Sequence, residues 1–275
     1  MSPRLHPMNA VDITALISGL IVGGSLGLTG GGGSIFAVPL LVYALKQPAT
    51  TAIALSLAMV GLTAGFGAAL RIGKSEIDWR AGLIFAASGM LCAPAGAWVG
   101  HRLPTALLLS AFALLMLFVG ARMWRRRPVE RTGPGPCEPT GGARPGWGCF
   151  LRLAAAGVAA GFLSGLFGVG GGFIIVPALL YVTGMGVHRA IATSLLVIFL
   201  ISITGVAASV AGGGHWPWRL ALVFLAGGLL GMGAGSATRA RLPARHLQQV
   251  FSVAMWVVAL FVLAKNAPAL MAASR

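Results

Sequence analysis

The sequence predicts an all-α polytopic membrane protein built from two homologous repeats. The chain has 275 residues, of which 57% are hydrophobic and only 9% are charged, and its mean hydropathy is +0.89. A soluble domain has roughly 25% charged residues. Apolar stretches long enough to cross a bilayer, which takes about 20 residues, follow one another from end to end. The composition therefore excludes a soluble domain that carries a single anchor.

The repeat is centred on a glycine-rich motif that occurs twice. Residues 27–39 read GLTGGGGSIFAVP, and residues 165–177 read GLFGVGGGFIIVP. Aligning the chain with itself at an offset of 138 residues gives 14 identities in the 31 positions of 27–57. After one inserted residue the match resumes, because the Trp-Arg pair at 79–80 falls on the pair at 218–219. The chain is therefore a tandem duplication.

The first apolar stretch is too long for one span and contains consecutive glycines. It runs from Val11 to Leu45 and includes Gly30 to Gly33. Glycine weakens a helix by roughly 1 kcal/mol per residue relative to alanine, so a helix should break there. The second piece, 34–45, would rise only about 18 Å. We expect two part-depth helices that meet at an unwound turn.

Three fuller spans are expected after the broken pair in each half. The first half has its broken pair at 11–28 and 34–45 and its spans at 50–70, 81–99 and 105–123. The second half has its broken pair at 153–167 and 173–183 and its spans at 190–210, 220–238 and 247–264. Each repeat, at residues 11–124 and 151–265, should thus hold a glycine-broken re-entrant helix pair plus three spanning helices.

Residues 125–150 between the repeats are polar, rich in Pro and Gly, and begin with RRRP. They show no apolar periodicity, which predicts a flexible linker. Its arginines place this linker in the cytoplasm. The whole chain carries a net charge of +15, from 20 Lys and Arg against 5 Asp and Glu. These basic residues lie in loops, where they orient spans and meet anionic lipid, so we expect a lipid bilayer rather than nucleic acid as the partner.

The two repeats can be parallel or inverted in the membrane. If each broken pair enters and leaves on one side, each half makes three net crossings and the repeats are inverted; four crossings would make them parallel. The loop at 71–80 holds three basic residues and its counterpart at 211–219 holds one, whereas 100–104 holds one and 239–245 holds three. Inverted copies should exchange their charge bias, as these do. The loops therefore favour inverted repeats.

The broken helices predict an anion site. Non-helical backbone at membrane depth is tolerated only where it is buried in protein or lines a wet cavity. A helix that starts at Ser34 directs its free amide groups and the positive end of its dipole at the first glycine turn. A helix that starts near Phe173 does the same at the turn of residues 168–172. Two such termini near the midplane can hold a small oxyanion without a full charge in the membrane.

Glycines can also serve only to let helices pack closely. We expect this packing role for the glycines at four-residue spacing, which are Gly19, Gly23, Gly27, Gly157, Gly161 and Gly165. Hydroxyl groups beside the turns could donate to an oxyanion or could bond to the carbonyl one turn earlier, and both alternatives stay open. The candidate substrate-binding residues are Thr29, Gly30, Gly31, Gly32, Gly33, Ser34, Ser56, Gly168, Gly170, Gly171, Gly172, Thr193 and Ser194.

The sequence shows no motif for catalysis or for a cofactor. None of the five acidic residues falls at the centre of a predicted span, so no carboxylate proton relay is visible. The five histidines lie in tails, loops or span ends. No metal-ligand cluster appears, and the GGGGS motif lacks the Lys-Ser or Lys-Thr of a phosphate-binding loop. We expect neither an enzyme nor a bound cofactor or metal.

Taken together, these motifs resemble the sulfite exporter TauE/SafE family of membrane transporters. The first half carries the resemblance in GLTGGGGSIFAVP, IDWRAGL (77–83) and HRLP (101–104). The second half carries it in GVGGGFIIVP, AIATSLL, WPWRLAL (216–222) and ARLP (240–243). The first copy departs from the pattern with Leu55 where the second has Thr193, which puts a symmetric hydroxyl site in doubt.

The resemblance implies movement of sulfite, thiosulfate or small sulfonates across the bacterial inner membrane. It does not specify the substrate, the direction, the coupling ion or the oligomeric state. We expect a secondary transporter that works by alternating access. The alternatives are an anion channel and a membrane scaffold or redox-assembly protein, for which the absence of a Cys-x-x-Cys pair is unfavourable.

Overall fold

The computed structural model describes residues 10–73, 76–125, 147–211, 217–238 and 244–273, and every regular element in these ranges is a helix. The expected all-α class is thus confirmed. The first half contains α1 (Ala10–Thr29), η1 (Gly32–Phe36), α2 (Ala37–Pro39), η2 (Leu40–Ala44), α3 (Ala49–Ile72), α4 (Trp79–Arg102) and α5 (Thr105–Arg125). The second half contains α6 (Trp147–Phe167), α7 (Gly172–Thr183), α8 (Val187–Ala211), α9 (Trp218–Thr238) and α10 (Ala244–Ala273).

Eight of the described helices are long and apolar enough to cross a membrane. They include the three spans predicted in each half, and also α1 and α6, which have 20 and 21 residues. Because 20 helical residues rise about 30 Å, α1 and α6 are longer than the part-depth helices expected from the sequence. α6 begins at Trp147, inside the range assigned to the linker. The rest of that linker, 126–146, and the loops at 212–216 and 239–243 lie outside the described residues.

Both predicted helix breaks fall at the glycines. α1 ends at Thr29 and is followed by Gly30, whose φ is 75°. α6 ends at Phe167 and is followed by Gly168, whose φ is 69°. A residue with a side chain rarely adopts this left-handed conformation, whereas glycine does so readily. The chain therefore turns out of each long helix at an equivalent position of the two repeats.

The short helices after the two breaks differ in regularity. In the second half, α7 is one continuous α-helix of 12 residues with Pro177 inside it. In the first half, η1 is a 3₁₀ segment, and η2 after Pro39 is a π-helical segment in which the Leu45 amide donates to the Leu40 carbonyl at 3.1 Å. The duplicated element has thus kept its place and diverged in its hydrogen bonding.

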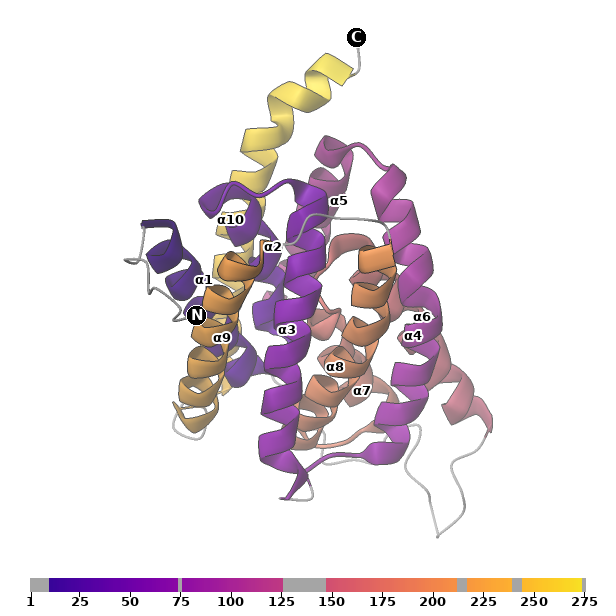
Figure 1. Ribbon diagram of the computed structural model, residues 1–275. Coiled ribbons are helices and arrows are strands. Elements are labelled where there is room, and N and C mark those ends of the chain that lie inside the picture. Colours follow the sequence, from indigo (N-terminus) through magenta and orange to yellow (C-terminus); the bar gives the residue numbers. More distant parts are fainter. Residues whose placement is uncertain (1–9, 74–75, 126–146, 212–216, 239–243, 274–275) are drawn as a thin grey trace.

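Contacts between the halves come in matched pairs. α1 packs on α9 and α6 packs on α4, and Figure 1 shows these pairs on opposite flanks of the molecule. A Cβ at Gly23 would collide with the Gly228 carbonyl, and a Cβ at Gly161 would collide with the carbonyl of Gly89, the counterpart of Gly228. The expected packing role is confirmed for all six glycines at four-residue spacing, which are Gly19, Gly23, Gly27, Gly157, Gly161 and Gly165.

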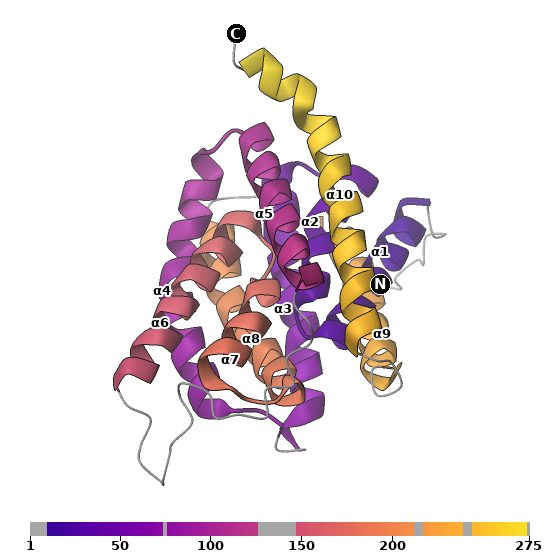
Figure 2. The same ribbon diagram turned by 180° about the vertical axis from the view of Figure 1, so that it is seen from behind.

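The central helices α3 and α8, which are counterparts in the two repeats, run in opposite directions. A Cβ at Gly205 of α8 would lie 3.2 Å from Leu57 of α3, and a Cβ at Gly67 of α3 would lie 3.2 Å from Leu195 of α8. The contact point thus moves backward along α8 as it moves forward along α3. α5 and α10, also counterparts, pack on each other, and Figure 2 shows them side by side in the foreground.

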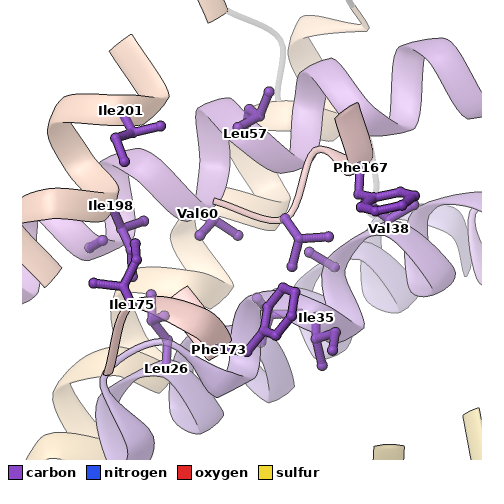
Figure 3. Packing of buried hydrophobic residues seen from close by; sticks show 14 of the residues in the cluster. Leu26, Ile35, Val38, Leu57, Val60, Phe167, Phe173, Ile175, Ile198 and Ile201 are labelled. Carbon is purple, nitrogen blue, oxygen red and sulfur yellow. The ribbon is translucent and has the colours of Figure 1, made fainter. Parts of the chain in front are cut away.

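Apolar side chains fill the interior and also cover the outside. Leu26 and Ile35 of the first half share one buried cluster with Phe173 and Ile175 of the second (Figure 3). On the outside, Leu91 of α4 is 81% exposed, and large apolar side chains lie exposed on other helices as well. In water such a surface would be unusual. It is the surface expected of a bundle surrounded by lipid.

Candidate functional site

The two glycine turns, 138 residues apart in the alignment, meet in the interior. A Cβ at Gly31 would lie 2.6 Å from the Cα of Gly172, and a Cβ at Gly172 would lie 2.5 Å from the Cα of Gly31. Gly31 precedes the first residue of η1, and Gly172 is the first residue of α7. The N-terminal ends of the two short helical segments therefore touch, backbone against backbone, and all the residues of both turns are buried.

In the first turn, the candidate hydroxyl groups bond to the turn itself. Thr29 Oγ1 donates to the Ser25 carbonyl at 2.7 Å and accepts from the Gly32 amide at 3.0 Å. Ser34 Oγ donates to the Gly31 carbonyl at 2.7 Å. These bonds fix the path of the chain between α1 and η1.

Ser194 joins the first turn to the second repeat. Its Oγ lies 2.6 Å from the Gly30 carbonyl oxygen and 2.8 Å from the Ile191 carbonyl oxygen, and the side chain is fully buried. A Cβ at Gly30 would collide with Ile191 of the same helix. α8 is thus closely packed against the first turn.

Thr193 contacts a different part of the chain from the glycine turns. Its Oγ1 accepts from the Asp78 amide at 2.9 Å, and Asp78 in turn caps α4 by accepting from the Ala81 amide at 3.0 Å. The counterparts of Thr193 and Asp78 are Leu55 and Pro217. Leucine has no hydroxyl and proline has no amide hydrogen, so both partners of this bond differ between the repeats. Thr193 thus differs from Leu55 because its hydroxyl binds the backbone just before α4.

Near the second turn, several buried serine hydroxyls make no hydrogen bond to the described residues. Gly168, Gly170 and Gly171 all have φ between 67° and 69°. Ser56, the counterpart of Ser194, is fully buried, and its Oγ has no hydrogen-bond partner among the described residues. The same holds for Ser110, Ser164 and Ser202, which are at most 6% exposed. Ser164 and Ser202 were missed in the sequence because a lone serine in an apolar span normally bonds to its own helix.

A small pocket lies beside the second turn, at one end of the bundle. It has a volume of about 10 Å³, which is room for roughly one water molecule. Ile53 lines this pocket and also contacts Gly168 of the turn. The full lining is Thr50, Ile53, Ala97, Gly100, His101, Gly165, Leu166 and Ser209.

The opposite end of the bundle carries a buried cation. The counterpart of Ser209 in the pocket is Arg71 on α3, which is 7% exposed. Its guanidinium donates to the Gly67 carbonyl at 3.3 Å and lies 3.7 Å from a Glu76 carboxylate oxygen. The equivalent position at the pocket end is Ser209, so the two ends carry different polar groups at counterpart positions.

A duplicated bundle of apolar helices, with two broken elements that meet inside it, defines a multi-pass integral membrane protein. The family model described as "Sulfite exporter TauE/SafE" matches residues 15–262, which include both repeats. The chain therefore belongs to the TauE/SafE sulfite exporter family.

Curated relatives cover the chain almost from end to end. A "Probable membrane transporter protein" of Xylella fastidiosa (strain 9a5c) is 35% identical over 266 residues, which cover 94% of this chain and 98% of that protein. "Probable membrane transporter protein YunE" of Bacillus subtilis is 26% identical and covers 90% and 95%, and a relative in Haemophilus influenzae is 28% identical and covers 90% and 96%. No solved structure matches. Family and relatives identify a membrane transporter.

Proposed function

We propose that the protein is a secondary transporter of a small anion. The substrate class that fits best is a sulfur oxyanion or a sulfonate, and the proposed binding site lies where the two glycine turns meet. The observation that carries this proposal is the contact between Gly31 and Gly172. At this contact the positive ends of two helix dipoles face each other, and the first amide groups of a helix have no intrahelical partner. Glycines have no side chain that would cover these amides, so a ligand of a few atoms can reach the backbone when the two turns separate.

The proposed transporter has inverted repeats. The antiparallel course of the counterpart helices α3 and α8 supports inversion, since parallel repeats would place counterparts parallel. In this arrangement each long first helix and the short helix after it form a re-entrant pair. The chain then returns to the face from which it entered before α3 or α8 begins.

Alternating access follows from inversion, because exchanging the conformations of the two halves turns an outward-open state into an inward-open one. The α1–α9 and α4–α6 pairs are the candidate rigid units, since glycines hold their backbones in close contact. Ligand release requires Gly31 and Gly172 to separate. The small pocket beside Ile53 is the proposed start of one access path to the turn.

The proposed location is the bacterial inner membrane, with the arginine-rich linker in the cytoplasm. The linker follows α5, so the end of α3 that carries Arg71 faces the same side, and the pocket faces the opposite side. Because the positive-inside rule places the basic linker in the cytoplasm, the pocket would face the opposite, periplasmic side of the membrane.

Thermal-shift binding with the purified protein tests the proposal. A ligand that binds only the folded state raises the melting temperature. Sulfite, thiosulfate and a sulfonate should raise it, whereas acetate at the same concentration and ionic strength should not. A shift with acetate alone, or with no anion of the panel, would contradict the proposed substrate class.

A further inference from the structure

Three buried serine hydroxyls surround the second glycine turn without a hydrogen-bond partner. Ser56 of α3 and Ser164 of α6 are fully buried, and Ser202 of α8 is 3% exposed. Within the part of the chain that the structure describes, none of the three Oγ atoms has a hydrogen-bond partner. An unsatisfied buried hydroxyl is costly, and nearly all such groups in folded proteins are paired. Three of them around one turn therefore require an explanation.

Ser202 and Ser164 face the turn from two sides. A Cβ at Gly170 would lie 3.9 Å from Ser202 Oγ, and a Cβ at Gly171 would lie 3.4 Å from the Cβ of Ser164. The carbonyl of Ser164 also accepts from the Gly168 amide at 2.8 Å, which holds the start of the turn against the end of α6.

Ser56 faces the turn from the third side. It lies three residues after Ile53 and four before Val60, spacings that place the three side chains on one face of α3. Ile53 contacts the turn at Gly168, where a Cβ would lie 2.6 Å from its Cα, and Val60 contacts it at Gly170, at 3.2 Å. The side chain of Ser56 therefore lies between these two contacts.

The first turn lacks this set of free donors. The counterpart of Ser56, Ser194, donates to the Gly30 carbonyl. The hydroxyls of Thr29 and Ser34 donate to the carbonyls of Ser25 in α1 and Gly31 in the turn. The first turn also leads into the irregular segments η1, α2 and η2, whereas the second leads into the regular α-helix α7. The two turns are thus related by duplication and have different hydrogen-bonding capacity.

We propose that the anion is coordinated on the second-turn side of the contact between Gly31 and Gly172, by the hydroxyls of Ser56, Ser164 and Ser202 together with the first amides of α7. The first turn closes this site from the other side and has a structural role. This inference rests on the proposed function and specifies its site. As Gly31 and Gly172 separate, an anion of a few atoms can enter beside the second turn, where each hydroxyl is a donor for one oxygen of a sulfonate-type group and the N-terminus of α7 faces the same group.

The donor set also predicts the charge of the ligand. The atoms nearest to Gly168, Gly170 and Gly171 belong to apolar side chains, to backbone groups and to serines. Neutral donors in an apolar interior compensate one charge more completely than two, because the desolvation cost of an ion rises steeply with its charge. The site should therefore prefer a monoanion such as methanesulfonate to a dianion such as sulfate.

Calorimetric titration of the full chain with methanesulfonate and sulfate tests this site. The wild type should bind methanesulfonate at least tenfold more tightly than sulfate. Ser56→Ala, Ser164→Ala and Ser202→Ala should each weaken methanesulfonate binding about tenfold, the expected effect of losing one charge-assisted hydrogen bond. Ser110→Ala is the matched control, since Ser110 on α5 is also buried and unpartnered. It should change the affinity less than twofold.

The melting temperature without ligand provides a second readout. Removing a hydroxyl that has no partner should leave it unchanged or raise it. A marked decrease in the three site variants would indicate that the hydroxyls hold a structural water, and would overturn the inference. If the wild type binds both anions and the three variants bind as well as Ser110→Ala, the site is wrong while the proposed function stands. If the wild type binds neither anion, the inferred site is overturned, and the thermal shift with sulfite and thiosulfate then decides whether the proposed function stands.

Discussion

Ser194 Oγ lies 2.6 Å from the carbonyl oxygen of Gly30, and this hydrogen bond joins α8 of the second repeat to the turn of the first. The bond is fully buried. Ser56 occupies the counterpart position in α3, and its hydroxyl has no hydrogen-bond partner in the described ranges. Two serines that descend from one ancestral position therefore differ in their present role, since one stabilises the fold and the other keeps its donor free.

Replacing Ser194 with alanine should destabilise the protein without ligand. The substitution leaves the buried Gly30 carbonyl unpaired, which costs about 1 kcal/mol. Thermal melts in detergent should show a lower melting temperature for Ser194→Ala and an unchanged or higher one for Ser56→Ala. Equal decreases in the two variants would contradict the assigned difference between the turns.

Gly172→Ala should abolish transport, because the added Cβ would lie 2.5 Å from the Cα of Gly31. Backbone atoms cannot move aside as a flexible side chain can, so the two turns must separate. Anion uptake into proteoliposomes measures the effect. Gly233→Ala on α9 is the matched control, since a Cβ there meets nothing within 4 Å.

Size-exclusion chromatography of both glycine variants separates loss of function from loss of folding. Gly172→Ala should elute as the wild type does while its uptake falls to the level of empty liposomes. A variant that elutes normally and transports at the wild-type rate would argue against a site between the turns.

Gly23→Ala should destabilise the α1–α9 pair, because the added Cβ would collide with the Gly228 carbonyl. Overpacking of this kind costs about 3 kcal/mol. The neighbouring Gly24→Ala is the control, since its Cβ would lie at an ordinary 3.6 Å from the Gly231 carbonyl. Expression level and melting temperature should fall only for the first variant. Gly161→Ala on the α6–α4 pair should behave like Gly23→Ala, and a neutral result there would contradict the matched packing.

Inverted repeats place counterpart residues on opposite faces of the membrane. Thr50 and His188 are counterparts, both exposed and both near the start of a central helix. Single cysteines at these positions, in a chain without its three native cysteines, should react with a membrane-impermeant maleimide from opposite sides of oriented vesicles. Labelling of both from the same side would show parallel repeats.

The positions of the two helix breaks could be predicted from the sequence, because consecutive glycines act locally on the backbone. The glycines at four-residue spacing were likewise predictable as packing residues, since the pattern reflects one helix face. The contact between the two turns, at Gly31 and Gly172, could also be expected, because equivalent elements of a duplicated fold approach each other near its symmetry axis.

The roles of the hydroxyl groups could not be predicted, because each depends on a partner far away in the chain. Thr193 is a candidate ligand in the sequence, and its hydroxyl accepts from the amide of Asp78, 115 positions earlier. Ser164 and Ser202 carried no signal at all, since only the packing of α6 and α8 shows that their hydroxyls lack a partner. The length of α6 was underestimated because its first turn, from Trp147, reads as the end of a polar linker.

Counterflow of radiolabelled sulfite in proteoliposomes tests the central claim most directly, because only a carrier exchanges labelled substrate for unlabelled substrate across a closed membrane. We predict that unlabelled sulfite inside the vesicles accelerates uptake of the label and that the rate saturates with external sulfite. The same preparation of Gly172→Ala should show neither effect. Uptake that rises without saturation and does not respond to internal sulfite would contradict alternating access and would indicate a channel.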